Sequence, residues 1–213
     1  MTARGALDHM INWLGYISAD EAGLLQDVAR LLPDNPVIIN VGAGSGTSGL
    51  ALLTSRSDAS VCTVDITLEN HPRGGIGSEA TLLRSAGIYD EVLASGRYRS
   101  IHGDTREVSK GWDDGPVDFV FIDDGHSYEE ASADIEGWLP HIVDGGFIAV
   151  HDYMKQRVWE DKNPDVPVDL HTLRHAIKPW PGVDSAVDDV LRKRHNLEET
   201  HRVDTTVVFR VKK

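Results

Sequence analysis

Hydrophobic residues form two patterns along the chain, short continuous runs and longer stretches with helical spacing. The continuous runs predict buried strands, because parallel strands that are covered on both faces are apolar along their length. The predicted strands are Val37–Val41, Ser60–Ile66, Tyr98–Ile101, Val117–Ile122 and Phe147–Val150. Helical spacing predicts helices over about 47–54, 79–86, 128–139 and 183–194. Strands that alternate with helices predict an α/β fold with a parallel sheet.

The two ends of the chain add further elements. Residues 1–36 carry apolar positions that predict two amphipathic helices, and Ser18 with Glu21 forms the capping-box pattern that begins the second. The segments Leu197–Val203 and Thr206–Val211 alternate like strands with almost no residues between them, which predicts a β-hairpin. The predicted architecture is a three-layer αβα sandwich around a Rossmann-like seven-stranded sheet with a terminal antiparallel hairpin.

Length and composition limit the classes of protein to consider. With 213 residues, 40% of them hydrophobic, we expect a single domain. It comprises N-terminal helices (1–36) and a core (37–213) that includes an irregular segment at 153–180. The net charge of -13 argues against a nucleic-acid partner, which needs an excess of Lys and Arg. No apolar run approaches the ~18 residues of a membrane span, and no signal peptide is recognisable, so we expect a cytoplasmic protein without a membrane partner.

Three alternating glycines, Gly42, Gly44 and Gly46, follow the first predicted strand and precede a helix. Glycines at this spacing let the backbone turn sharply and let a ligand approach closely. The free N–H groups of the following helix point at the same spot. The pattern predicts a nucleotide-type pocket at the carboxyl end of the first strand. Residues 44–49 also satisfy G-x-G-x-x-G, so a dinucleotide is an alternative ligand.

Charged residues stand at the ends of the next four predicted strands. Asp65 ends the second strand, Asp104 follows the third, and Asp123 follows the fourth. The pair His151-Asp152 follows the fifth. Ligands of open α/β sheets bind outside these strand ends. Charged side chains are rarely buried there unless they bind a ligand or take part in a reaction. We therefore expect these residues to belong to a functional site.

Several features favour a cofactor other than a dinucleotide. The terminal hairpin stands where a dehydrogenase would need a further half and a substrate domain. The acidic rim suits a cationic ligand without phosphate, and Asp104 is placed to accept from an adenine amino group. The sequence G-K-[ST] is absent, which excludes a P-loop. The Tyr-x-x-x-Lys pair that would support a nicotinamide-dependent oxidoreductase or epimerase is absent too.

The segment Asn40–Gly46 resembles the first motif of the class I S-adenosylmethionine-dependent methyltransferases, [acid]-x-G-x-G-x-G, with Asn40 in the place of the acid. The resemblance covers roughly residues 18–213. It implies S-adenosylmethionine as the cofactor, its methionine part held by Asn40, Gly42, Gly44 and Gly46. The amide oxygen of Asn40 can accept from the ligand's ammonium in place of the usual carboxylate.

The same resemblance assigns the residues after the next strands. It implies that Asp65 binds both ribose hydroxyls of the cofactor and that Asp104 and Thr105 meet its adenine. Asp123 would lie near the transferable methyl group, hold a metal ion, or cap the helix that follows. These alternatives remain open at the level of the sequence.

The stretch from Phe121 to Tyr153, FIDDGHSYEEASADIEGWLPHIVDGGFIAVHDY, resembles a narrower branch, the cephalosporin-hydroxylase-like and macrolide-sugar O-methyltransferases. The resemblance implies a Mg²⁺ ion held by Asp123 and Asp152. His151 departs from it, because those enzymes carry a carboxylate at this position. Imidazole is a poor ligand for Mg²⁺.

Methyl transfer from a sulfonium requires an in-line approach and the removal of a proton from the methyl acceptor. His126 and His151 are the candidate bases, because both follow strand ends that face the cofactor. Each could instead cap a helix or pair with Asp124 or Asp152. The favoured function is O-methylation of a small molecule with a histidine base or a divalent metal. The alternatives are a nicotinamide-dependent oxidoreductase or epimerase and a non-catalytic binding module with a methyltransferase fold.

The methyl acceptor is characterised least by the sequence. Segment 153–180 follows the fifth strand, and we expect it on the acceptor side of the fold. It contains five basic residues in an otherwise acidic protein: Lys155, Arg157, Lys162, Arg174 and Lys178. They form either a solvated loop with scattered charge or a grip on an anionic small molecule, for which Arg157 is the best candidate. The sequence leaves open whether the chain forms a homo-oligomer.

Overall fold

The computed structural model describes residues 16–69, 74–153 and 180–213. Its strands are β1 (Val37–Val41), β2 (Ser60–Asp65), β3 (Tyr98–His102), β4 (Val117–Ile122), β5 (Ile142–Val150), β6 (Leu197–Val203) and β7 (Thr206–Val211). Its helices are α2 (Ala19–Arg30), α3 (Thr47–Ser55), α4 (Ile76–Ser85), α5 (Tyr89–Ala94), α6 (Thr105–Lys110), α7 (Tyr128–Trp138) and α9 (Pro181–Ala186). A 3-10 turn, η1 (Leu139–His141), follows α7, and a π-helical turn, η2 (Val187–Leu191), follows α9.

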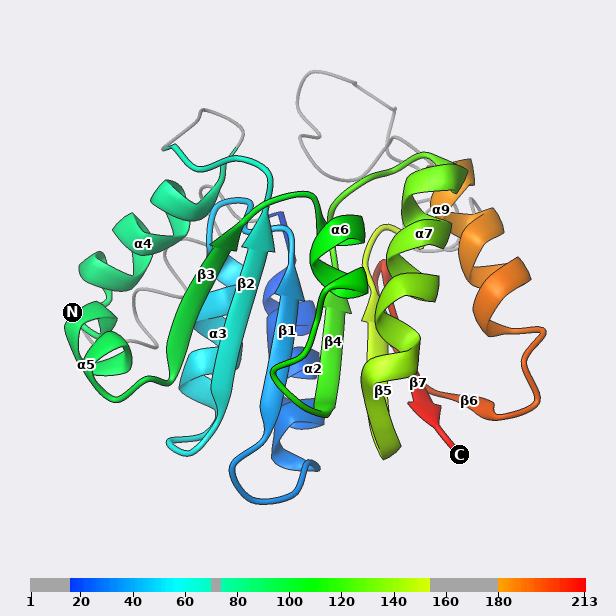
Figure 1. Cartoon of the computed structure of the whole chain (residues 1–213), viewed down its shortest axis with the longest axis horizontal. Helices are drawn as coiled ribbons and strands as arrows, with labels where there is room; N and C mark the ends of the chain where they lie inside the picture. The colour runs from blue at the N-terminus through cyan, green and yellow to red at the C-terminus, as the bar shows by residue number, and fades with distance from the viewer. Residues whose placement is uncertain (1–15, 70–73, 154–179) are drawn as a thin grey trace, which may run out of the picture.

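The strands form one sheet in the order β3-β2-β1-β4-β5-β7-β6 (Figure 1). Strands β1 to β5 run parallel, and β7 pairs antiparallel with both β5 and β6. The strand order reverses between β1 and β4, and open α/β sheets bind ligands at such a point, outside the carboxyl ends of the strands. The predicted αβα sandwich with a seven-stranded sheet and a terminal hairpin is confirmed.

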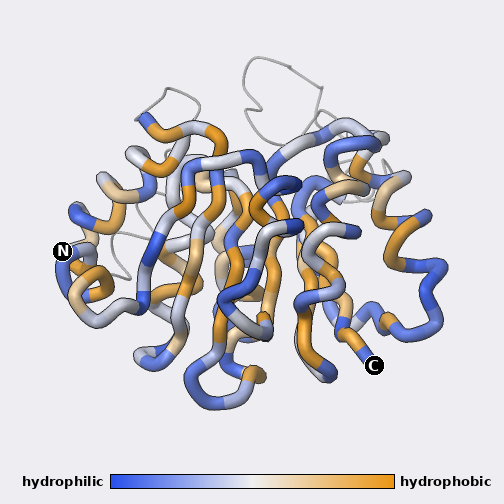
Figure 2. Tube along the Cα trace, viewed as in Figure 1, coloured by the Kyte–Doolittle hydropathy of each residue, from blue (hydrophilic) through white to orange (hydrophobic). Residues whose placement is uncertain are grey.

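Each face of the sheet has its own hydrophobic core, because successive residues of a strand point to opposite faces. In β1, Ile38 packs in the core with α2, α3 and α4, and Ile39 packs in the core with α7 and α9. Phe121 and Ile122 of β4 divide in the same way. In Figure 1, α6, α7 and α9 lie in front of the sheet and α2 and α3 behind it. Figure 2 shows the hydrophobic residues along the central strands that these layers cover.

The predicted capping box near the N-terminus and the predicted hairpin at the C-terminus are both confirmed. The side chain of Ser18 accepts from the backbone N–H of Glu21, and Glu21 accepts from the backbone N–H of Ser18, so the predicted capping box begins α2. The hairpin strands β6 and β7 have the predicted bounds. None of the helices in the described ranges is long and apolar enough to cross a membrane.

Other boundaries were predicted wrongly. Helix α4 begins at Ile76, three residues before the predicted start, and β5 begins at Ile142 and runs through Gly145-Gly146, with a register shift against β4. Helices α5 and α6 were missed, because six residues each are too few to display a helical period. The last helix begins at Pro181 and ends in the π-helical turn. The first N-terminal helix and most of segment 153–180 fall outside the described residues.

Candidate active site

The glycine loop after β1 lies against the end of β4. Gly42 has a φ of 87°, and a Cβ at this position would lie 2.1 Å from the carbonyl oxygen of Asp123. Gly44 and Gly46 also have positive φ values, 49° and 91°, and Gly46 is the N-cap of α3. A side chain would be strained at these dihedrals, and at Gly42 it would collide with the neighbouring strand end. The glycines predicted from the sequence therefore shape a tight loop at the carboxyl edge of the sheet.

Asp65, the last residue of β2, holds this loop in place. Its carboxylate accepts a 2.7 Å hydrogen bond from the backbone N–H of Ala43 and a 2.6 Å bond from that of Thr67. Directly beyond it, the apolar side chains of Ile66 and Leu68 are 62% and 54% exposed. Sequence reasoning assigned Ile66 to a strand and overlooked Leu68. Their exposure beside a buried carboxylate leaves an apolar surface that a flat ring can cover.

Asp104 and Thr105 begin α6, and both side chains have partners within the protein. Asp104 accepts from the backbone N–H of Arg106 at 2.9 Å and pairs with the guanidinium of the same residue. These contacts hold the pKa of Asp104 at about 2. The hydroxyl of Thr105 is buried and accepts from the indole N–H of Trp138 at 2.8 Å. The Thr105 side chain thus has a partner within the protein, and its contact with adenine stays a prediction.

Asn40 is fully buried within β1. Its amide nitrogen donates to the carbonyl of Gly42 at 3.4 Å and to the hydroxyl of Thr63 at 3.3 Å. Its Oδ1 atom has no hydrogen-bond partner among the described residues. Asn40 thus contacts the first glycine of the loop from inside the protein, and its contact with a ligand ammonium stays a prediction.

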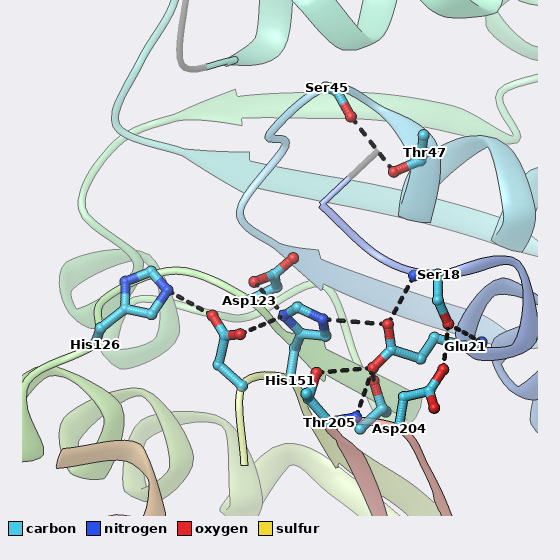
Figure 3. Close-up of polar contacts among 11 residues, drawn as sticks. Ser18, Glu21, Ser45, Thr47, Asp123, His126, His151, Asp204 and Thr205 are labelled. Atoms are coloured by element: carbon cyan, nitrogen blue, oxygen red, sulfur yellow. Dashed lines mark hydrogen bonds and ion pairs between the residues drawn. The ribbon is translucent and has the colours of Figure 1, made fainter. Parts of the chain in front are cut away.

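The residues after β4 and β5 form a connected chain of polar contacts (Figure 3). Nε2 of His126 lies 2.7 Å from Oδ2 of Asp152, and Nδ1 of His151 lies 3.5 Å from Oδ1 of the same aspartate. Nδ1 of His151 also lies 3.0 Å from Oδ1 of Asp123. The side chain of His126 is 37% exposed, whereas His151 is 6% exposed. The structure therefore brings all four of these predicted residues together.

A further residue, Glu21 of α2, completes the surroundings of His151 (Figure 3). Its Oε2 atom lies 3.4 Å from Nε2 of His151, and Oε1 accepts from the backbone N–H and the hydroxyl of Thr205 at 2.9 and 2.8 Å. The sequence identified Glu21 only as part of a helix cap, because its distance of 130 residues along the chain from His151 hides the contact. We call Glu21, Asp123, His126, His151 and Asp152 the histidine centre.

The charged groups of the histidine centre stabilise one another in their ionised forms. Burial lowers the pKa of His151, but the charge of Asp123 and hydrogen bonds to Asp123, Asp152 and Glu21 outweigh it and raise this pKa well above 6.5. Burial also lowers the pKa of His126, and the hydrogen bond to Asp152 raises it above 6.5. The pKa of Asp152 is lowered, because these hydrogen bonds outweigh its burial. Asp152 is therefore a carboxylate, and His151 is held as an imidazolium.

A small cavity that is open to solvent lies at the histidine centre. Its walls include Asp123, Asp124, His126, Asp152 and Val183. Burial, followed by the charges of Asp65 and Asp123, raises the pKa of Asp124 to about 6. The cavity thus joins the strand ends to α9 and has an acidic lining.

Trp180 packs against the exposed side of the histidine centre. Its ring centroid lies 4.2 Å from that of His126, with 34° between the ring planes. A Cβ at Gly182 would lie 2.6 Å from the carbonyl oxygen of His126, so α9 begins directly against this residue. His126 is therefore held between Trp180 and Asp152. The five basic residues of segment 153–180, including Arg157, lie outside the described residues.

Among the described residues, ligand atoms of Asp123, His126 and Asp152 lie within 4.8 Å of one another. The two carboxylates predicted to hold Mg²⁺ are therefore close together. The third donor is an imidazole, however, and the cationic ring of His151 contacts both carboxylates. Mg²⁺ prefers a set made of oxygen atoms alone. The donor set is thus a poor match for Mg²⁺.

Comparison with known proteins identifies the family. A family model described as a methyltransferase domain matches residues 39–153, more than half of the chain. A protein of Mycolicibacterium smegmatis named as a putative O-methyltransferase is 32% identical over 138 residues, which are 64% of this chain and 60% of that protein. A relative of the same name from Mycobacterium sp. (strain JLS) is 35% identical, with 57% of its length covered. The matched region thus spans less than two thirds of these relatives.

Solved structures show the same fold. The O-methyltransferase TomG from Streptomyces achromogenes, involved in tomaymycin synthesis and solved with S-adenosylmethionine, superposes with a TM-score of 0.67 at 19% identity, covering 99% of this chain and 89% of that one. The Podospora anserina methyltransferase PaMTH1, solved with S-adenosylhomocysteine, gives 0.69 at 17% identity, with 99% and 88% covered. The resemblance seen in the first motif is confirmed at the level of the family, and the narrower branch stays a prediction. On the match over residues 39–153, the chain belongs to the methyltransferase-domain family.

Proposed function

We propose that this protein transfers the methyl group of S-adenosylmethionine to a hydroxyl oxygen of a small molecule. The observation that carries the proposal is the hydrogen-bonded pair of His126 and Asp152 at a cavity beside the glycine loop. The loop lies within the region that the family model matches. O-methylation needs these two features next to each other, a cofactor site and a base that removes the proton of the methyl acceptor.

The cofactor site is proposed at the carboxyl ends of β1 and β2. Asp65 keeps lone pairs for the ribose hydroxyls even while it accepts two backbone hydrogen bonds, because a carboxylate has about four acceptor positions. Ile66 offers an exposed apolar surface for the adenine ring. Asp104 at the start of α6 is the proposed partner of the adenine amino group. The acidic lining of the adjacent cavity favours the positive sulfonium of the cofactor over a neutral ligand.

His126 is the proposed general base, and the structure suggests which of its nitrogens acts. Because Asp152 is a carboxylate, it accepts a hydrogen bond, so Nε2 of His126 carries the hydrogen. The neutral ring then has its lone pair on Nδ1. We propose that Nδ1 takes the proton of the methyl acceptor while the oxygen attacks the methyl group in line. Asp152 stabilises the imidazolium that results.

His151 is proposed to act by its charge rather than as a base. It is buried, and both ring nitrogens face carboxylates, so it has no free lone pair to take a proton. Its imidazolium neutralises part of the charge of Asp123 and Asp152, which keeps the two carboxylates close to each other. This assignment separates the two histidines that the sequence left as equal candidates.

A divalent cation would offer a different route to deprotonation. Such an ion would be held by Asp123 and Asp152, with His126 as the third donor, and when bound it would lower the pKa of a hydroxyl on the methyl acceptor. It would also break the hydrogen bond between His126 and Asp152. Because the set matches Mg²⁺ poorly, we assign no step of the reaction to it.

The cofactor assignment is tested by calorimetric titration of the full chain with S-adenosylhomocysteine and, separately, with NAD. We expect S-adenosylhomocysteine to bind and NAD not to. Binding of NAD alone would support the oxidoreductase or epimerase alternative. Turnover is then tested with S-adenosylmethionine and a panel of phenols, sugar hydroxyls and carboxylates. Cofactor binding without turnover of any class would support a binding module, and turnover confined to carboxylates would support the anionic methyl acceptor proposed from Arg157.

A further inference from the structure

A second buried polar group lies beneath the glycine loop, away from the histidine centre. Glu79 of α4 is fully buried. It occupies the space that two glycines leave open, since a Cβ at Gly49 would lie 1.8 Å from its Oε1 atom and a Cβ at Gly46 would lie 3.1 Å from its Cβ. The contact at Gly46 extends to the backbone of α4, where Cα of Glu79 would be 2.6 Å away. Two glycines of the loop and its helix are therefore needed to admit Glu79.

Hydrogen bonds connect Glu79 to the loop from below. The hydroxyl of Tyr98 donates to Oε2 at 2.7 Å, and the hydroxyl of Thr63 donates to Oε1 at 3.0 Å. The oxygen of Thr63 accepts from the amide of Asn40 at 3.3 Å, and the same amide nitrogen donates to the carbonyl of Gly42 at 3.4 Å. Asn40 and Thr63 are directly paired in the register of β1 and β2. We call Asn40, Thr63, Glu79 and Tyr98 the Glu79 network.

The direction of donation along the Glu79 network matters. The carbonyl of Gly42 can only accept, so Asn40 must turn its NH₂ group toward it and toward Thr63. The hydroxyl of Thr63 accepts from Asn40 and therefore donates its single hydrogen to Glu79. An ionised carboxylate can accept this hydrogen and the hydrogen of Tyr98 as well. A proton on Glu79 would make its oxygens weaker acceptors for these two hydrogens, because hydrogen bonds to an ionised carboxylate are the stronger ones. The network is therefore held most firmly when Glu79 is ionised.

The structure assigns Glu79 as a positioning residue for the cofactor loop, whose ionised carboxyl fixes the carbonyl of Gly42 through Thr63 and Asn40. This assignment rests on the proposed function, since the loop is taken as the cofactor site. A second contact supports it, because the backbone N–H of Gly75, the N-cap of α4, donates to the carbonyl of Gly44 at 2.8 Å. Helix α4 thus contacts the loop at Gly44 through its N-cap and at Gly46 through Glu79.

The charge state of Glu79 changes within a range that experiments can reach. Burial raises the pKa of Glu79 to about 7, the hydrogen bonds from Tyr98 and Thr63 lower it, and the charge of Asp65 adds to the increase. The titratable groups near it are Asp65 of β2 and Tyr98 of β3, which contacts Tyr89 of α5, and Cys62 of β2 on the other face of the sheet. Helix α3 presents no titratable side chain. Affinity for the cofactor should therefore fall as the pH drops through about 7.

The test measures the dissociation constant of S-adenosylhomocysteine between pH 5.5 and 8.5 for the wild type and Glu79→Gln. We expect the variant to bind about tenfold more weakly at pH 8, the loss of roughly one hydrogen bond, and to converge with the wild type at pH 5.5. Asp124 and Asp134 have pKa values of about 6 and about 7 and titrate in the same range, so the difference between the two proteins is the readout. Glu198→Gln, at an exposed glutamate on β6, is the matched control.

Thr63 provides a variant that tests the chain of bonds directly. Thr63→Val should weaken binding about as much as Glu79→Gln, and Thr63→Ser, which keeps the hydroxyl, should restore it. Equal affinity of the wild type, Glu79→Gln and Thr63→Val at every pH would overturn the positioning role while leaving the proposed function intact. A wild type that binds neither S-adenosylmethionine nor S-adenosylhomocysteine would overturn the proposed function instead.

Discussion

The histidine centre and the Glu79 network each contain a buried glutamate beside the same sheet, but the pKa values of the two carboxyl groups are shifted in opposite directions. Glu21 lies against the imidazolium of His151, and its pKa falls to about 2 because this partner and nearby hydrogen bonds outweigh burial. Glu79 has only neutral donors, and burial raises its pKa to about 7. A buried carboxyl is stabilised by an opposite charge and is otherwise costly to ionise.

The difference also separates two kinds of site. The histidine centre ends in His126, which is 37% exposed and can meet a substrate. The Glu79 network ends on a backbone carbonyl of the glycine loop and is closed to solvent. A charge at the first can take part in chemistry, whereas a charge at the second can act only through the shape of the loop. The following predictions test whether this division holds.

Loss of the proposed base should have the largest effect. His126→Gln removes the group that accepts the proton, so we expect kcat for methyl transfer to fall by about 10²–10⁴-fold. Affinity for S-adenosylhomocysteine should stay unchanged, because His126 is not part of the cofactor loop. His195→Gln, at an exposed histidine, is the matched control and should keep full activity. A variant His126→Gln with wild-type kcat would show that the exposed end of the histidine centre has no catalytic role.

The two buried glutamates should respond oppositely to neutralisation. Glu21→Gln leaves the imidazolium of His151 short of a partner, and we expect the free energy of unfolding at pH 7 to fall by about 3 kcal/mol. The pKa of Glu79 is raised in the folded state to about 7. The free energy of unfolding therefore falls as the pH rises from about 4.5 through 7. Glu79→Gln cannot ionise and should not show this fall. At pH 8 this variant should be the more stable one.

Urea denaturation of both variants at pH 5 and pH 8 measures these changes. The same sign of effect for Glu21→Gln and Glu79→Gln at pH 8 would remove the distinction between the two regions. A Glu79→Gln protein that gains stability and loses cofactor affinity would support the distinction. A residue with a merely structural role would not change stability and affinity in opposite directions.

The sequence predicts these regions unequally, for physical reasons. Asp123, His126, His151 and Asp152 could be predicted to meet, because each follows a strand and the carboxyl ends of parallel strands share one edge. Glu21 and Glu79 could not, since each sits on a helix at a position that periodicity treats as ordinary. Their partners come from packing between a helix and the sheet, which local patterns do not encode.

The cofactor residues show the same limit at shorter range. The glycines were found by their spacing, but Gly46 and the neighbouring Gly49 make room for Glu79 as well as forming the loop. Asn40 and Thr105 were identified by motif position as ligand contacts. In the structure both side chains bond within the protein, and only neighbouring strands and helices decide that. Motif spacing therefore predicts the loop conformation, whereas the direction of each side chain depends on the neighbouring strands and helices.

A smaller effect is expected on the pH dependence of the reaction. Methyl transfer needs neutral His126, so the rate should rise as the pH increases through the pKa of His126, which Asp152 holds above 6.5. Asp152→Asn removes that charge and should move the acidic limb of kcat to lower pH by about one unit. Asparagine suits the site, because the φ of residue 152 is 60°, a conformation that Asn adopts readily. An unmoved limb would mean that the titrating group is not paired with Asp152.

Removal of metal ions should have the smallest effect, and it addresses the histidine centre as a whole. If the imidazolium of His151 balances Asp123 and Asp152, the centre already holds its counter-charge, and a divalent cation would have to displace the bond between His126 and Asp152. We therefore expect dialysis against EDTA to leave kcat unchanged and added Mg²⁺ not to raise it. Loss of activity in EDTA that Mg²⁺ restores would reverse the assignment: Asp123 and Asp152 would then act as metal ligands, as the sequence resemblance implies. Mn²⁺ restoring activity where Mg²⁺ does not would point to His126 as the third ligand, because imidazole suits transition metals better.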